Sequence, residues 1–371
     1  MKNKMVLIAM VMIFSGQFYA QWNMSVSTYQ EYNENPFRYR ETSPELISSY
    51  NLGIEKEFGD FNILYFGSYS TLSKTTDMNY FWHQGGLYTN WSNSTLGAYF
   101  EQRINKEEYN YYDANLYSAY FRTSTMTDIA NLKFNTAVSY TSYPNLSDFN
   151  NLLLNASVVV NKSFETKTTL IGAAIINFKS YKDKIDSISL TGRGMQRGRN
   201  SLLNSSSVNI TQLELNGRVA QSLFEQTGLA FNINYKKILS GSSVSVGVIE
   251  SVYGETELYE DPVAQEGFSM GAMLTQIIPF DVSLQAGYFY YDKTYPSQGR
   301  YLSVDSFESA IQRHDLMNNF YLTASKMFYL GEEDENNLNL SINYTLVNNN
   351  SNSYYYQYSG SLISLKLDYQ F

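Results

Sequence analysis

The sequence predicts an all-β protein, a transmembrane antiparallel up-and-down β-barrel formed by residues 21–371 behind a signal peptide of residues 1–20. Three observations predict this fold. The chain begins with an export signal, its segments of about ten residues alternate between apolar and polar positions, and short turns alternate with long loops. The predicted strand number is sixteen, with fourteen as the alternative if the N-terminal segment is a plug.

The N-terminus has the features of a secretory signal peptide. Lys2 and Lys4 supply the positive charge, and residues 5–14 form an apolar run of ten. That run is too short to cross a bilayer as a helix, which takes about 20 residues. Ala20 is a small residue suited to precede the cut, so we expect cleavage between Ala20 and Gln21.

Composition excludes several classes of protein. Loss of the two lysines with the signal peptide changes the net charge from -9 to -11, and such an acidic chain argues against nucleic acid as a partner. The absence of cysteine excludes disulfides, thiolate metal sites and a lipoprotein anchor. No apolar run after the signal reaches about 20 residues, which excludes helical membrane spans. An aromatic content of 16% with only 6 prolines favours strands over disorder.

The last segment shows the alternation best, because successive side chains of a strand point to opposite faces. One face suits hydrocarbon and the other suits water. The odd positions are Ile363, Leu365, Leu367, Tyr369 and Phe371, and the even positions are Ser364, Lys366, Asp368 and Gln370.

The same division recurs along the chain, for example over residues 229–236, 282–290 and 338–346. The polar faces carry mostly Asn, Ser, Thr, Gln and Tyr. In a soluble sandwich the exposed faces would carry more Lys and Glu than a charged content of 16% allows. A water-filled or side-chain-filled lumen explains this composition better.

Connections of two lengths alternate, as in a barrel with short turns at one end and long loops at the other. Short turns are expected at residues 58–60, 92–94, 225–228 and 279–281. Long extracellular loops are expected near residues 33–44, 141–150, 180–206, 237–265, 294–313 and 347–354, and the region 237–265 has an extra hairpin over residues 244–253 as its alternative.

Sixteen strands follow from these boundaries, and an even number brings both termini to the periplasmic side. About ten residues per strand are enough to cross a bilayer at the usual tilt. The expected strands are 22–32, 45–57, 61–72, 79–91, 95–104, 111–122, 129–140, 151–162, 169–180, 207–221, 229–237, 266–278, 282–292, 315–328, 337–346 and 355–371.

These features resemble the outer-membrane β-barrel superfamily of Gram-negative bacteria, in particular its porin-like members or its channels for hydrophobic solutes. Tyr369 and the terminal Phe371 look like the C-terminal signal that the barrel-assembly machinery recognises in that superfamily. The resemblance covers the whole mature chain and implies an outer-membrane location. It also implies outer-membrane lipid, lipopolysaccharide and the assembly machinery as partners.

Two loops of opposite charge are candidates for a constriction. One loop carries Arg193, Arg197 and Arg199, and the other carries Glu255, Glu257, Glu260, Asp261 and Glu266. Facing inward, they would set a transverse field across the lumen. The alternative is a solvated basic loop, or one that binds phosphate groups of lipopolysaccharide, an anionic solute or a partner.

Charged residues on the polar strand faces are candidates for the lumen. Glu214 and Arg218 lie on one such face, beside Gln212 and Asn216, and Lys366 and Asp368 lie on another. The alternative is that opposite charges pair and simply stabilise the interior of the barrel.

Enzymatic activity has little support, because a hydrolase needs a base near neutral pH and the chain has only His83 and His314. His83 lies among aromatic residues, where a girdle or lumen position is expected. His314 and Asp315 point to opposite faces of a strand and form no dyad. A loop that folds back would be needed to bring Asp305 to His314. We expect no cofactor and no metal site.

Asn35 and Pro36 resemble an Asn-Pro element near the N-terminal hatch of barrels that carry fatty acids and aromatic hydrocarbons. The preceding residues alternate well, with Trp22, Met24 and Val26 against polar neighbours. This pattern favours a true first strand followed by a turn.

The leading functional hypothesis is a channel or porin-like transporter for small solutes, because sixteen strands enclose a lumen too wide for side chains alone to fill. A barrel that anchors extracellular loops for a protein partner and a transporter of hydrophobic substrates are the alternatives. A His-dependent outer-membrane hydrolase is the minor one.

Overall fold

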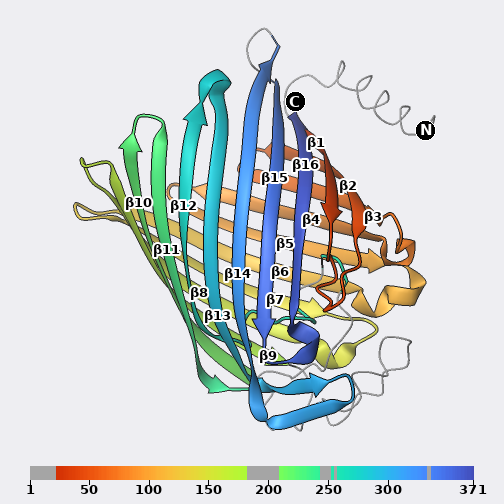
Figure 1. Cartoon of the computed structure of the whole chain (residues 1–371). Coiled ribbons are helices and arrows are strands. Elements are labelled where there is room, and N and C mark those ends of the chain that lie inside the picture. The colour runs from red at the N-terminus through yellow and green to blue at the C-terminus, as the bar shows by residue number, and fades with distance from the viewer. Residues whose placement is uncertain (1–21, 182–208, 243–251, 255–256, 332–335) are drawn as a thin grey trace, which may run out of the picture.

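The computed structural model describes residues 22–181, 209–242, 252–254, 257–331 and 336–371. Sixteen strands form one closed antiparallel barrel in which each strand pairs with its neighbours in the chain (Figure 1). The strands are β1 Trp22–Asn33, β2 Glu45–Phe58, β3 Phe61–Leu72, β4 Tyr80–Trp91, β5 Ser94–Asn105, β6 Ala114–Met126, β7 Asn131–Ser142, β8 Asn151–Ser163, β9 Thr168–Tyr181, β10 Asn209–Phe224, β11 Thr227–Gly241, β12 Glu266–Ile278, β13 Val282–Ser303, β14 Ser306–Leu330, β15 Asn336–Ser351 and β16 Tyr358–Gln370.

The first and last strands close the barrel. In the register of β1 with β16, Val26 lies opposite Tyr369 and Asn33 lies opposite Leu362, while the other edge of β1 pairs with β2. This confirms sixteen strands and shows that the alternative of fourteen was wrong, because the N-terminal segment is a strand of the wall and not a plug.

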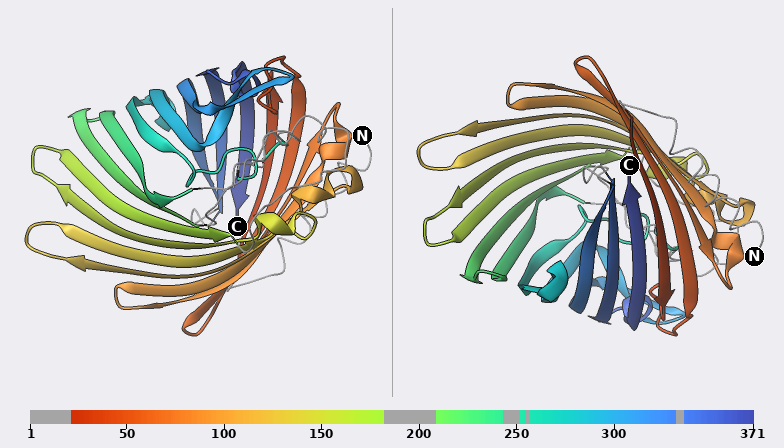
Figure 2. Two further views of the ribbon diagram at one scale, coloured as in Figure 1. Left: turned by 90° about the horizontal axis from the view of Figure 1, so that it is seen from below. Right: turned by 90° about the horizontal axis from the view of Figure 1, so that it is seen from above.

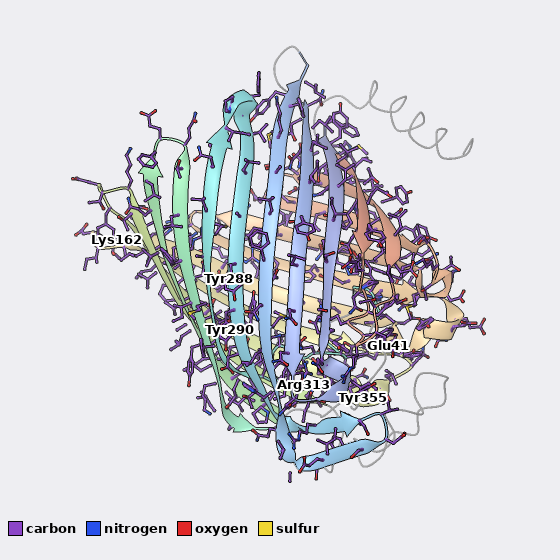
Figure 3. All side chains as sticks on the ribbon, viewed as in Figure 1. Glu41, Lys162, Tyr288, Tyr290, Arg313 and Tyr355 are labelled. Atoms are coloured by element: carbon purple, nitrogen blue, oxygen red, sulfur yellow. The ribbon has the colours of Figure 1, made fainter. Side chains whose placement is uncertain are left out.

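The two faces of the wall differ in polarity as the alternation predicted. On β16, Ile363 is 50% exposed on the outer face, whereas its neighbour Ser364 is 5% exposed and faces the lumen. A barrel has no second layer to cover its outer face, so apolar side chains remain exposed there. Figure 3 shows such outward side chains, among them Tyr288 and Tyr290 of β13.

Glycines on the lumen face make room for aromatic rings of the next strand. Gly97 lies opposite Tyr120, and a Cβ added at Gly97 would come within 2.4 Å of the Tyr120 ring. Gly287 lies opposite Tyr321, and a Cβ added at Gly287 would likewise come within 2.4 Å of the Tyr321 ring. Rings that lie flat over glycine occupy less of the lumen than rings that stand upright.

The connections differ at the two ends of the barrel, hereafter the turn end and the loop end. The short turns, the first residue of β1 and the last residue of β16 lie at the turn end, and the long connections lie at the loop end (Figures 1 and 2). The predicted loop 294–313 was wrong, since β13 runs on to Ser303 and β14 begins at Ser306. Register shifts around Gly299 break the alternation there but not the pairing.

A small hydrophobic core fills one side of the loop end. Short 3-10 helices over Thr76–Met78, Glu107–Tyr112 and Ser147–Phe149 contribute to it. No helix among the described residues is long and apolar enough to cross a bilayer. The buried members of the core are Phe37, Ile47, Leu72, Met78, Tyr112, Tyr143, Leu146, Phe149, Tyr181, Val252 and Leu258.

Candidate functional site

The candidate site is the lumen near the loop end, where the connection between β11 and β12 folds inward. We call its described residues, 252–254 and 257–265, the inserted segment. Arg103 of β5 donates a hydrogen bond from Nη2 to the Tyr253 carbonyl oxygen at 2.8 Å, and Gln212 of β10 donates to the Gln265 carbonyl at 2.8 Å. Because these contacts reach different parts of the wall, the segment lies across the lumen.

Glu260 attaches the inserted segment to β13 and to the first loop. Lys293 donates to its Oε1 at 2.6 Å, the Tyr295 hydroxyl donates to the same oxygen, and Arg38 Nη1 lies 3.4 Å from Oε2. Burial alone would raise the pKa of the Glu260 carboxyl, but Lys293, Arg313 and Arg38 outweigh it and hold the pKa well below its ordinary value. Glu260 is therefore ionised inside the barrel.

Lys179 of β9 holds the same segment from another part of the wall. Its Nζ forms ion pairs with Glu257 and, at 2.7 Å, with Asp261. Asp261 also accepts a hydrogen bond from the Tyr181 hydroxyl at 2.7 Å. Burial tends to raise the pKa of Asp261, yet Lys179 and these hydrogen bonds lower it overall.

Apolar contacts complete the attachment of the inserted segment. Val252 and Leu258 are buried in the hydrophobic core of the loop end, against side chains of the first four long connections. The segment is thus fixed by ion pairs on its polar side and by packing on its apolar side.

A second buried charge cluster supports the wall beside the segment. The Arg313 guanidinium forms an ion pair with Asp315 and lies over the rings of Tyr356 and Tyr295, at 3.3 and 3.9 Å from their centroids. Burial raises the pKa of Tyr356 to about 12, although Arg313 opposes the change. Figure 3 labels Arg313 and Tyr355, both of which lie at the loop end.

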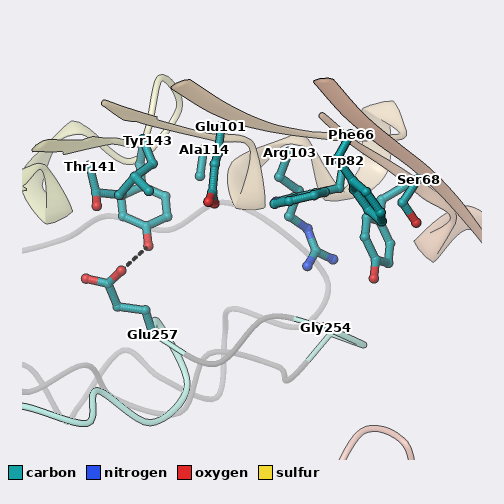
Figure 4. A pocket seen from close by; sticks show the side chains of 12 residues that line it. Phe66, Ser68, Trp82, Glu101, Arg103, Ala114, Thr141, Tyr143, Gly254 and Glu257 are labelled. Atoms are coloured by element: carbon teal, nitrogen blue, oxygen red, sulfur yellow. Dashed lines mark hydrogen bonds between the residues drawn. The ribbon is translucent and has the colours of Figure 1, made fainter. Parts of the chain in front are cut away.

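The inserted segment leaves a cavity on each of two sides. The first, of 530 Å³, lies against β3–β7 and is shown in Figure 4. The second, of 580 Å³, lies against β1 and β13–β16, and Gly254 and the carboxyl-bearing Glu260 line it from the segment. The side chains that line the first cavity are Phe66, Ser68, Tyr80, Trp82, Glu101, Arg103, Leu116, Thr141 and Tyr143, with Ala114, Gly254 and Glu257.

The predicted lumen residues all lie on the inner face but in separate places. Glu214 accepts from Asn234 at 2.6 Å and lies 3.7 Å from Lys236 Nζ. Arg218 contributes to a further cavity of 300 Å³ on β9–β13. Lys366 and Asp368 pair with each other at 2.8 Å. Glu214, Lys366 and Asp368 therefore fit the alternative prediction, in which opposite charges of the wall pair with one another.

The predicted acidic loop is only partly in the lumen. Glu257, Glu260 and Asp261 face inward, whereas Glu266 pairs at 2.8 Å with Lys237, a side chain of the outer face of β11. Arg193, Arg197, Arg199 and Glu255 lie outside the described residues, as does nearly all of the alternative hairpin 244–253. Lys179, Lys293 and Arg38, which were not among the predicted site residues, neutralise the acidic side chains.

These missed cations were detectable in part. Lys179 and Lys293 occupy the polar positions at the loop ends of β9 and β13, where an inward-folded acidic loop needs positive partners. No such pattern pointed to Arg38, because its contact with Glu260 depends on how the first loop folds.

The two histidines lie on the outer face. His83 Nδ1 and the Tyr65 hydroxyl lie 2.8 Å apart, and the His83 ring stacks on Phe81. His314 Nε2 lies 2.8 Å from Asp292, and Asp315 faces the lumen instead. Within the described ranges, no three His, Cys, Asp or Glu side chains gather where they could hold a metal ion.

Asn35 and Pro36 form a turn after β1, as predicted. The Arg38 amide donates to the Asn35 carbonyl oxygen at 3.2 Å, and the Asn35 side chain caps Tyr39 through 2.7 and 2.9 Å hydrogen bonds. The resemblance to a hatch element therefore reflects local turn geometry.

No protein-family model and no curated protein matches the sequence. Solved structures of outer-membrane porins share its fold over 95% of this chain and 98% of theirs. They include OccK8 (OprE) of Pseudomonas aeruginosa, with a TM-score of 0.54 and 8% identity, and OpdK of the same organism with vanillate, with 0.54 and 7%. OccAB3 of Acinetobacter baumannii has a TM-score of 0.52 and 6% identity. The chain thus has the closed sixteen-strand fold of these outer-membrane porins.

Proposed function

We propose that the protein is an outer-membrane channel for small solutes. The observation that carries this proposal is the lumen itself, where the inserted segment leaves cavities of 530 and 580 Å³ on its two sides. Barrels of sixteen strands are wide enough to hold an aqueous passage, and an inserted segment narrows it to the size of a small molecule.

The outer face supports a membrane location. Apolar side chains cover it, and aromatic side chains such as Trp91 and Tyr329 at the turn end and Tyr32 and Tyr235 toward the loop end suit the two interfaces of a bilayer. With the turn end in the periplasm, the inserted segment faces the extracellular side. The signal peptide of residues 1–20 remains a prediction that agrees with this route.

Single-channel recording tests the proposal. Purified protein in planar bilayers is expected to give discrete conductance steps, and their size is expected to rise when the inserted segment is loosened. Silence of the wild-type protein after verified folding and insertion would contradict the channel. Urea-extracted membranes and protein-free detergent serve as blanks.

The extended β13–β14 hairpin favours a second candidate function, the binding of a protein partner. The hairpin projects past the other strands at the loop end (Figure 1), and Leu302 at its tip is 54% exposed. Rings of Tyr301, Phe307 and Tyr355 pack behind the tip at centroid distances of 4.9 Å. A stoichiometric partner that is lost on Leu302→Asp, together with absent conductance, would support this function over the channel.

A further inference from the structure

We propose that the 530 Å³ cavity between the inserted segment and β3–β7 binds a zwitterionic solute with an apolar side chain, such as a neutral amino acid. Glu101 would hold the ammonium group and Arg103 the carboxylate. The inference rests on the proposed channel function, because it identifies the class of solute that the channel admits.

Glu101 and Arg103 are charges of opposite sign on the lumen face of one strand, and among the described residues neither is held in an ion pair. Arg103 is only 7% exposed, yet its hydrogen bonds go to neutral acceptors, Asn105 Oδ1 at 3.1 Å and the Tyr253 carbonyl at 2.8 Å. Glu101 accepts from the neutral Gln84 amide at 2.8 Å. Among the described residues neither has an ion pair within 4.0 Å, unlike Lys179 and Lys293 of the same lumen.

A buried charge without a counter-charge is costly, and a ligand of opposite charge removes that cost. The guanidinium of Arg103 suits a carboxylate, because a charged donor at Nη1 forms a stronger hydrogen bond with an ionised acceptor than with a neutral one. The carboxylate of Glu101 suits an ammonium group in the same way. The cavity thus offers one site of each sign.

The two charges are placed so that one small molecule reaches both. Glu101 and Arg103 are two positions apart on the lumen face of β5, about 6.5 Å along the strand. Figure 4 shows both side chains directed into the cavity. A volume of 530 Å³ lies within the usual range of small-molecule sites, about 300–1,000 Å³.

Aromatic and aliphatic side chains supply the apolar part of the site. Phe66 and Trp82 meet edge to face with ring centroids 5.4 Å apart, and Leu116 and Ala114 line the same cavity. These groups favour a solute that carries an apolar side chain beside its charged end.

The inserted segment closes the site through Gly254. Its φ of +79° suits glycine, and a Cβ there would come within 2.6 Å of the Tyr80 hydroxyl and 3.3 Å of Arg103 Nη1. Nε and Nη2 of Arg103 already donate to Asn105 and Tyr253, and the guanidinium lies 3.9 Å from the centroid of the Tyr80 ring, so Nη1 is the nitrogen that has no hydrogen-bond acceptor among the described residues.

Solutes of a single charge are disfavoured by the same arrangement. An anion meets the carboxylate of Glu101, and a cation meets the guanidinium of Arg103. A zwitterion satisfies both sites and leaves no charge unmatched. This is the property that separates the proposed class from simple carboxylates and amines.

The test compares three solutes of one shape as blockers of the current in planar bilayers at pH 7. The zwitterion is L-leucine, the cation is L-leucinamide and the anion is 4-methylpentanoate. We expect half-block by leucine at a concentration about tenfold below that of either analogue, since one charge-assisted hydrogen-bonded contact is worth about this factor.

Two variants assign the contacts. Glu101→Gln is expected to remove about tenfold of the preference for leucine over 4-methylpentanoate, because the anion is no longer repelled. Arg103→Gln is expected to remove about tenfold of the preference over leucinamide. Lys133→Gln is the matched control, because it removes a lumen charge near the turn end and is expected to leave the ranking of the three solutes unchanged.

The outcomes separate this inference from the channel itself. A conducting wild-type protein that is blocked equally by all three solutes overturns the zwitterion site and leaves the channel standing. A folded, inserted protein without conductance overturns the channel. The wild-type comparison decides the inference even where Arg103→Gln fails to fold, and Arg103→Lys then replaces it, with an intermediate preference expected.

Discussion

Glu260 is an acidic side chain that remains charged inside the barrel because Lys293, Arg38 and Arg313 surround it. Taking a carboxylate out of water is costly, and several cations with a hydrogen bond from Tyr295 offset that cost. The arrangement explains how an acidic loop of an acidic protein lies in the lumen instead of in the solvent.

Replacement of Glu260 by Gln is expected to release the inserted segment. Breaking a buried ion pair costs about 3 kcal/mol or more, so the fraction of molecules in which the inserted segment is released should rise about a hundredfold. The wild-type chain contains no cysteine, so Ala264→Cys, at a buried position of the segment, reports opening by its rate of maleimide labelling. Glu308→Gln, in an ion pair of the projecting hairpin, is the control and should not change the rate.

The attachment of the inserted segment through Glu260 should weaken only as the pH falls. The pKa of Glu260 in the folded protein is below the ordinary value of about 4.3. Its contribution to the attachment of the inserted segment is therefore complete above that pH and decreases as the pH falls further. We expect single-channel conductance to be constant between pH 8 and about 4.5 and to rise in more acidic buffer. A rise between pH 8 and 6 would contradict this role of Glu260.

At the scale of elements, the inserted segment differs from an ordinary loop in having an apolar anchor. Leu258 is 3% exposed in the hydrophobic core that the first four long connections build. Ion pairs and packing therefore hold one short stretch of chain from opposite sides, and the position of that stretch sets the size of both cavities.

Leu258→Ala is expected to loosen the segment, because removal of a buried leucine side chain costs about 2–5 kcal/mol. The expected result is a larger or noisier single-channel conductance with an intact barrel, verified by heat-modifiable mobility in SDS gels. Leu239→Ala is the matched control, since Leu239 is 56% exposed on the outer face of β11. Equal conductance of both variants would argue against the anchor.

At the scale of the whole molecule, the closing strand joins the two ends of the chain. The Phe371 amide donates to the Met24 carbonyl oxygen at 3.0 Å, the Met24 amide donates back to Phe371 at 2.9 Å, and the rings of Tyr369 and Phe371 stack at 5.2 Å. The terminal aromatic residue thus lies at the seam that closes the barrel.

Phe371→Ser is expected to lower the fraction of protein that assembles in outer membranes, because the predicted signal for the assembly machinery is lost. The measurement is the folded fraction on unheated SDS gels. Tyr329→Ser removes an exposed aromatic residue from the same end of the barrel and is the control. Equal assembly of the two variants would contradict a special role for Phe371.

The sequence by itself determined the faces of the strands, because alternation depends only on neighbours along the chain. It favoured sixteen strands over fourteen, and the pairing of β1 with β16 then decided the number. Ile363 and Ser364 could be assigned to opposite faces without any knowledge of the fold. The extension of β13 to Ser303 escaped this pattern, since bulges near Gly299 shift the alternation while the pairing continues.

Only the tertiary structure decided what occupies the lumen. Lys179 and Asp261 are 82 positions apart, and Arg38 and Glu260 are 222 positions apart, so no local pattern could pair them. The charges of Glu101 and Arg103 were likewise visible in the chain, but only the structure shows that neither forms an ion pair with another described residue. Local periodicity fixes which way a side chain points, whereas the partner it meets across a closed barrel depends on how distant segments fold inward.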